Sequence, residues 1–414
     1  MSPPLSSAWL KTHQRGIFLA ASGISTAGSF AGITAKSWLL LHQSGNPLLL
    51  ALHFAALAMP ALLFSAPAGV LTDRRGCERV LIRSQWGLFG GSLVGALALP
   101  LLHTWPTLVG AALMLSTLLV GIASSYELTA RNKYCALLVD KPDGLAPYLA
   151  SFSVVFNVGK LVGPPLGGLL VAWQGPAGAL AVDCASYLLP IASVVWLLQP
   201  DRSRDQRSGL GERTSLRSAW SQAGPTLRHV LRFSALASLV GFFHPGLAAL
   251  IAQRILGPTP ADLGLFTSVL AAGSIAGGLV LQRHSRRLSQ RPGLLLGSCL
   301  LITAWAQLGM AFNTHLAVSL TMTFLIGAGT AGLLAGSNLI LQVGAPMELR
   351  GRMAGMGQIA SLGGGGLSGM LAALLCLQIG LNGTFALMGL AGLALALQEL
   401  LINRGLRIRS TAHP

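Results

Sequence analysis

The stretch GVLTDRRGCER at residues 69–79 joins two long apolar segments and shows how the whole chain is organised. It gathers five charged side chains, three of them arginines, into one short loop. Apolar segments and short polar loops alternate in the same way along the rest of the chain, and a bilayer core needs ~20 apolar residues per helix. The sequence therefore predicts an all-α membrane protein.

The positive charges return in every second loop. With both ends of the chain placed on the cytoplasmic side, all but three of the 28 Lys and Arg fall in inner loops or at the inner ends of the adjoining spans; the exceptions are Lys36, Lys160 and Arg254. Loops rich in Lys and Arg stay in the cytoplasm. We therefore expect a multi-pass protein of the bacterial inner membrane with both termini cytoplasmic.

The composition excludes several other classes of protein. The 414 residues are 52% hydrophobic and only 10% charged, whereas a soluble domain has ~25% charged residues. The net charge of +16 is spread over many loops, so we expect no nucleic-acid partner. The five cysteines are scattered, without a CxxC pair, so we expect no metal site or disulfide framework. No nucleophile–base set or cofactor motif occurs, and we expect neither an enzyme nor a bound cofactor.

Twelve apolar segments are long enough to cross the membrane. The longest polar stretch falls between the sixth and the seventh, which predicts an N-terminal six-helix bundle at 1–199, a cytoplasmic linker at 200–226 and a C-terminal six-helix bundle at 227–414. The predicted spans are 16–39, 48–71, 80–101, 106–127, 147–173, 177–198, 230–252, 263–282, 293–313, 316–340, 353–376 and 383–403.

The two halves resemble each other in sequence. GPPLGGLL at 163–170 in the fifth span is similar to GGGLSGML at 364–371 in the eleventh, and both follow a polar inner loop. Two similar halves related by an axis along the membrane normal are a known transporter plan. The sequence therefore predicts twelve transmembrane helices in two pseudo-symmetric six-helix bundles.

The loop at 69–79 resembles the signature cytoplasmic loop of the major facilitator superfamily, G-x-L-x-D-R-x-G-x-[RK]. The resemblance implies a cytoplasmic gate that latches the two bundles through the acid, facing the eleventh span. A carboxylate is stabilised at a helix N-terminus, which suits such a latch. The gate residues implied are Gly69, Asp73, Arg74, Arg75 and Arg79.

GKLVGPPLGG at 159–168 resembles the g-x-x-x-G-P-x-x-G-G motif of exporters and antiporters in this superfamily. Proline and glycine predict a local bend that buried neighbours tolerate, and small residues let helices approach closely and slide. The resemblance implies a helix-hinge surface made of Gly159, Gly163, Pro164, Pro165, Gly167 and Gly168.

Over nearly the whole chain the sequence is similar to one branch of the superfamily, which includes the enterobactin exporter and macrolide-efflux proteins. Many proton-coupled drug exporters carry an Arg within the fourth span, but residues 113–125 contain none. The usual proton-relay residue is therefore missing from this span.

Charges within the spans are candidates for function, because each costs about 2.5–3.5 kcal/mol at the bilayer centre. By helix rise, Lys160 and Asp183 lie at similar depths, so we expect them to pair, either as a structural ion pair or as a substrate or proton site. Lys36 lies near the outer interface, where it either snorkels or faces the cavity.

The stretch His244-Pro245-Gly246 is expected to interrupt the seventh span, and broken helices near the midplane point to binding sites. His53 and Asn157 are further candidates for contact with substrate or protons. Because Lys36, Lys160, His53 and His244 outnumber Asp183, the predicted cavity is positive and suits an anionic solute.

Together these features predict a proton-driven exporter that moves a siderophore, or a similar small anionic or amphiphilic metabolite, by alternating access and works as a monomer. Within transport, the alternatives are a multidrug efflux pump, a lysophospholipid flippase and a siderophore importer. The alternative from another class is a non-transporting membrane partner or sensor.

Overall fold

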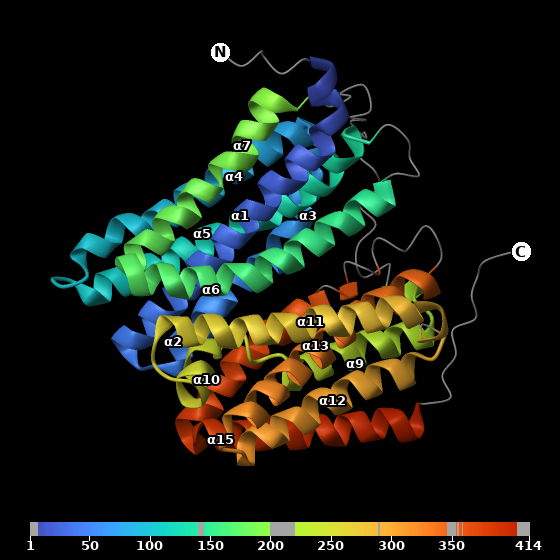
Figure 1. Cartoon of the computed structure of the whole chain (residues 1–414). Helices are drawn as coiled ribbons and strands as arrows, with labels where there is room; N and C mark the ends of the chain where they lie inside the picture. The colour runs from blue at the N-terminus through green and yellow to red at the C-terminus, as the bar shows by residue number, and fades with distance from the viewer. Residues whose placement is uncertain are drawn as a thin grey trace, which may run out of the picture. The chain divides into compact units, whose positions relative to one another are not determined.

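The computed structural model describes residues 7–139, 145–198, 220–288, 290–345, 353, 356–357 and 359–403, and most of the side chains from residue 13 onward (Figure 1). These residues are almost entirely helical, and none of them forms a strand. Most of the predicted linker, 200–219, lies outside the described residues.

Within each described range, the helices follow one another with short connections. Their bounds are α1 Ser7–Ser44, α2 Pro47–Ala58, α3 Pro60–Arg75, α4 Cys77–Ala98, η1 Leu99–Leu101, α5 Pro106–Leu137, α6 Leu145–Ser186, α7 Leu188–Ala192, η3 Ser193–Leu197, α9 Pro225–Gly241, α10 Ala248–Ile255, α11 Pro260–Leu288, α12 Pro292–Phe312, α13 Leu316–Gly344, η6 Ile359–Gly363 and α15 Gly364–Ile402.

The twelve predicted spans are all present. In the described residues, eight helical segments are long and apolar enough to cross a membrane, and two of them are 44 residues long. Each of these two holds a pair of spans that meet at a glycine with φ of 72°, Gly175 in α6 and Gly380 in α15. The charged helix α4 and the broken pair α9–α10 supply the remaining two spans.

The chain forms two compact units. Unit 1 comprises Met1–Gly45, Met59–Gly211 and Thr259–Leu265; unit 2 comprises Asn46–Ala58, Glu212–Pro258 and Phe266–Pro414. Helix α2 thus groups with unit 2, where it packs on α15, and the start of α11 groups with unit 1. The domain bounds expected from the sequence stay a prediction.

Within unit 1, α1 packs along α6, and α4 packs along α5. Phe18 fixes one end of this arrangement, because its ring centroid lies 5.3 Å from that of Tyr134 and 5.5 Å from that of Phe152. Within unit 2, α12 packs against α13 and α15, and α9 packs against α15 (Figure 1). The packing of α1 on α6 places Lys36 beside Asp183.

Candidate functional site

Helix α1 approaches α6 on a stripe of glycines. Gly28, Gly32 and Lys36 follow one another at four-residue spacing and so share one face of α1. A Cβ atom on Gly32 would lie 2.6 Å from Cγ of Asp183, and one on Gly28 would lie 2.6 Å from Cβ of Ser186. Only glycine permits this approach, which brings Lys36 beside the Asp183 carboxylate.

Lys36 and Asp183 form a buried ion pair. Nζ of Lys36 lies 3.8 Å from Oδ2 of Asp183, and each side chain is 3% exposed. From α4, the Ser92 hydroxyl donates a hydrogen bond of 2.5 Å to the same carboxylate oxygen. The pair is therefore held by α1, α4 and α6 together.

Two further hydroxyl groups, those of Ser29 and Tyr187, lie next to the carboxylate. Oγ of Ser29 donates to the Tyr187 hydroxyl at 2.9 Å, and Tyr187 adds a weaker interaction with Asp183. Oδ1 of Asp183 is buried, and among the described residues no donor reaches it with full hydrogen-bond geometry. The carboxylate is thus held chiefly at Oδ2, by Lys36 and Ser92.

This arrangement has two chemically distinct states. Removing one partner of a buried ion pair costs about 3–5 kcal/mol, because the other charge is left in a medium of low dielectric. A proton on Asp183 would leave the charge of Lys36 buried without its partner. A buried ammonium group without its partner is unfavourable, so the charges of Lys36 and Asp183 depend on each other.

The pairing predicted for Lys160 and Asp183 is wrong, because Lys36 occupies the place beside the carboxylate. Equal depth in the membrane does not put two residues on facing sides of their helices. Lys160 is half-buried on α6, and no described residue lies within ion-pair distance of it. The snorkelling interpretation of Lys36 is also wrong, since the side chain is buried and paired.

The glycine motif of the fifth span makes a packing surface against α1. Cβ atoms added to Gly159, Gly163 and Gly167 would meet backbone atoms of Ala27 or Ala31 at 2.5 to 3.3 Å. The two helices are therefore in backbone contact over this length. The backbone of α6 stays helical through the two prolines of the motif, and its non-helical position lies later, at Gly175. The hinge role stays a prediction.

The next glycine of the motif faces a different helix. A Cβ atom on Gly168 would lie 2.5 Å from the carbonyl oxygen of Pro260, in the first turn of α11. In return, a Cβ atom on Gly264 would lie 2.7 Å from the carbonyl oxygen of Pro164 and 3.0 Å from Cα of Pro165. Within unit 1, α6 and the start of α11 thus touch backbone to backbone.

The interruption predicted at 244–246 is confirmed in unit 2. Helix α9 ends at Gly241, and α10 begins at Ala248. His244 is 1% exposed. Its ring stacks on Phe243 at 4.1 Å between centroids and lies 5.7 Å from the ring of Phe385. Its contact with substrate stays a prediction.

The remaining candidates are dispersed. His53, on α2 in unit 2, is 2% exposed. The side chains of Asn157 and Asp73 lie outside the described residues.

At the proposed gate, α3 gives way to α4 at Gly76, whose φ of 85° favours glycine. Arg74, Arg75 and Arg79 are exposed there, and Gly69 is half-buried. The latch itself stays a prediction.

Sequence reasoning missed the polar residues that hold the ion pair, Ser92, Ser29 and Tyr187. The glycine spacing on α1 was the available signal, because small residues four apart mark a close helix contact. Lys36 continues the four-residue spacing of Gly28 and Gly32, so it faces the same neighbouring helix, α6.

Replacing Gly32 with Ala is expected to destabilise the protein, because the new methyl group must displace the Asp183 side chain. Overpacking of this kind costs about 1–3 kcal/mol. Gly16→Ala, in the same helix, is the matched control, since a Cβ atom there meets nothing within 4 Å. Thermal unfolding in detergent should show a lower Tm for Gly32→Ala and an unchanged or higher Tm for Gly16→Ala. Equal Tm values would contradict the close packing described at Gly32.

Comparisons with known proteins agree with this architecture. The chain is 27% identical over 394 residues to the multidrug efflux pump Tap of Mycolicibacterium fortuitum, covering 92% of this chain and 93% of the relative. It is 22% identical to the staphyloferrin A transporter of Staphylococcus aureus, covering 95% and 97%. A solved D-xylose–proton symporter shares the fold with a TM-score of 0.74 at 15% identity, covering 94% and 97%.

The family model that matches this chain defines a membrane transporter of the major facilitator superfamily, not an enzyme, in agreement with the helical fold described above. The family model described as transmembrane secretion effector matches residues 6–412. The chain belongs to this family of transporters.

Proposed function

We propose that this transporter is a proton-driven exporter of small amphiphilic molecules in the bacterial inner membrane. It works as a monomer by alternating access, with both termini in the cytoplasm. The proposal rests on the buried pair of Lys36 and Asp183. Charged side chains within transmembrane helices are costly in free energy and commonly serve proton transfer.

In this proposal Asp183 is the proton carrier. A proton that enters from the outer side binds the carboxylate, the ion pair separates, and Lys36 turns toward water as α1 shifts. Release of the proton to the cytoplasm restores the pair. The glycine contacts along α1 and α6 suit this movement, because small residues let helices approach closely and slide.

The contact between α6 and α11 is a candidate for the seal on the outer side of the transporter. Gly168 and Gly264 lie at the outer ends of their spans in the proposed topology. There the backbone of α6 is in direct contact with the backbone of α11. We propose that this contact seals the outer side and separates when substrate is released. Asp73 and its neighbouring arginines would provide the seal on the cytoplasmic side.

The charges in the structure favour an amphiphilic substrate over a strictly anionic one. Lys36 is neutralised by Asp183, and the rings of His53 and His244 are buried. Of the positive candidates with described side chains, Lys160 alone is only half-buried and lacks a described partner for its charge. Two relatives of the chain are named a multidrug efflux pump and a staphyloferrin A transporter.

Export of an anionic siderophore is the second candidate, and it rests on Lys160. An ammonium group within a span and without a described counter-ion suits a carboxylate of the solute.

Efflux of ethidium, an amphiphilic cation, tests the first candidate. The gene is expressed in a bacterium that lacks its major efflux pumps, and the loss of cell fluorescence is followed after loading. We expect efflux several times faster than with empty vector, and none after a protonophore collapses the proton gradient. Efflux that survives the protonophore would contradict proton coupling. Rates equal to the empty vector for ethidium and a panel of amphiphilic drugs would contradict multidrug export.

Mass spectrometry of medium and cells under iron starvation tests the second candidate, with and without the gene. Siderophore export predicts that a chelator disappears from the medium and accumulates inside the deletion strain. Lys160→Met should then reproduce the deletion for the chelator while ethidium efflux continues. Unchanged chelator levels in the deletion strain would eliminate siderophore export.

A further inference from the structure

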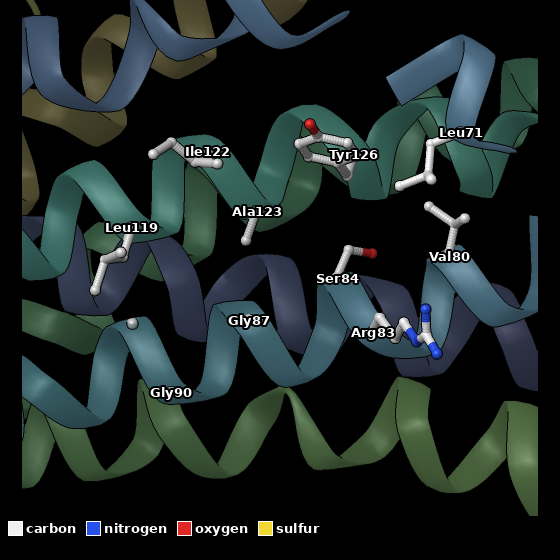
Figure 2. A pocket seen from close by; sticks show the side chains of 11 residues that line it. Leu71, Val80, Arg83, Ser84, Gly87, Gly90, Leu119, Ile122, Ala123 and Tyr126 are labelled. Atoms are coloured by element: carbon white, nitrogen blue, oxygen red, sulfur yellow. The ribbon is translucent and has the colours of Figure 1, made fainter. Parts of the chain in front are cut away.

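Unit 1 contains a groove of about 480 Å³ between α4 and α5, closed at one end by α3. Figure 2 shows the two helices facing each other across it, with Gly90 and Leu119 at one end and Val80, Arg83 and Leu71 at the other. This groove is separate from the ion pair, whose residues do not line it.

The part of the groove floor that lies on the middle of α4 is made of glycines. Gly87, Gly90 and Gly91 line it, and a Cβ atom on Gly90 would meet nothing within 4 Å. The opposite wall is an apolar stripe of α5 that includes Leu119 and Ile122. The groove therefore runs along two transmembrane helices, which is the direction an acyl chain takes in a bilayer.

Arg83 makes one end of the groove positive. It lies six residues after Cys77, the start of α4, which is about 9 Å along the helix axis. Helical side chains lean toward the N-terminus of their helix, so the guanidinium leans toward the arginine-rich loop at 69–79. Arg83 is exposed, and no carboxylate with a described side chain lies within ion-pair distance of it.

We propose that the groove binds one acyl chain of an anionic phospholipid of the cytoplasmic leaflet, with the lipid phosphate at Arg83. The apolar length suits the chain, and the cation at its end suits the headgroup, since a basic pocket between transmembrane helices on the cytoplasmic side is where anionic headgroups bind. The choice of leaflet rests on the topology proposed above. The binding itself is independent of transport.

Native mass spectrometry of the purified protein in detergent tests the proposal, with dioleoyl phosphatidylglycerol and dioleoyl phosphatidylcholine as probes. Gly90→Leu should fill the groove without strain in the fold, because its side chain enters open space. The control is Gly110→Leu, another open helical glycine, which lies in α5 outside the groove. Arg83→Gln separates the headgroup contact from the acyl contact.

The wild-type protein should retain phosphatidylglycerol in preference to phosphatidylcholine. Gly90→Leu should weaken retention of both lipids by about tenfold, the factor that corresponds to losing contact with roughly two CH₂ groups. Arg83→Gln should abolish only the preference, and Gly110→Leu should behave as the wild type.

Unchanged lipid retention by Gly90→Leu would overturn the proposal. So would a loss of ethidium binding by Gly90→Leu with lipid retention unchanged, because the groove would then be a substrate site. The assay needs no proton gradient, so its outcome can be told apart from a failure of the export proposal.

Discussion

Asp183→Asn is expected to abolish proton-driven efflux, because the amide cannot exchange a proton with the membrane gradient. The variant should also lose about 3–5 kcal/mol of stability, since Lys36 is left charged, buried and without its partner. Uptake of ethidium into everted membrane vesicles, driven by a proton gradient, measures the first effect, because export from the cell corresponds to uptake by an everted vesicle. Thermal unfolding in detergent measures the second.

A double variant separates a proton-coupling role from a structural one. Lys36→Met combined with Asp183→Asn removes both charges, and it should recover much of the stability that the single variant loses, because no buried charge remains unpaired. Transport should stay absent. If the double variant recovered proton-driven efflux as well as stability, the pair of Lys36 and Asp183 would serve only to hold α1 against α6, with no role in proton coupling.

Glu399→Gln is the matched control for this pair. Glu399 is also a buried carboxylate, 2% exposed, but it is held in unit 2 by His229 at 2.9 Å and by Asn403 at 2.9 Å. Its loss should lower stability while proton-driven efflux continues. Loss of efflux in this variant as well would remove the special role assigned to Asp183.

Gly168→Leu is expected to reduce efflux by roughly 5- to 150-fold, because the contact between α6 and α11 cannot form around a side chain. The added Cβ atom would lie 2.5 Å from the carbonyl oxygen of Pro260 and 3.0 Å from Cα of Ala261, and backbone atoms cannot rotate away as a side chain does. Overpacking costs about 1–3 kcal/mol, which corresponds to roughly 5- to 150-fold in an equilibrium between two conformations.

The measurement for Gly168→Leu is the rate of ethidium efflux at equal protein abundance. Gly110→Leu is the control, since it adds the same side chain in open space on α5. Normal efflux by Gly168→Leu would show that the contact is not part of the transport cycle. A loss of efflux by both variants would show that a leucine at either glycine is harmful for a general reason.

The twelve spans were predictable because membrane helices obey a simple length and polarity rule. Apolar stretches near 20 residues and the return of Lys and Arg at alternate loops located every span, although several helices, such as α1 and α11, extend beyond the predicted bounds. The break at 244–246 was also predictable, because proline removes a backbone donor and the glycine that follows it is a poor helix former.

The ion pair was not predictable from depth alone. Hydropathy gives the height of a residue in the membrane, but it does not give the direction that the residue faces around its helix. Gly28 and Gly32 determine that direction for Lys36, since they mark the face of α1 that meets α6. Ser92 carries no sequence signal, because a serine within an apolar helix more often bonds its own backbone.

Proton movement by the purified protein tests the central claim most directly. The transporter is reconstituted in liposomes that contain a fluorescent pH indicator, and ethidium is supplied on one side without any imposed gradient. We predict that ethidium drives protons in the opposite direction through the wild-type protein and Glu399→Gln, and that neither Asp183→Asn nor the double variant with Lys36→Met moves protons. Substrate-driven proton movement through the double variant, at the wild-type rate, would contradict the account.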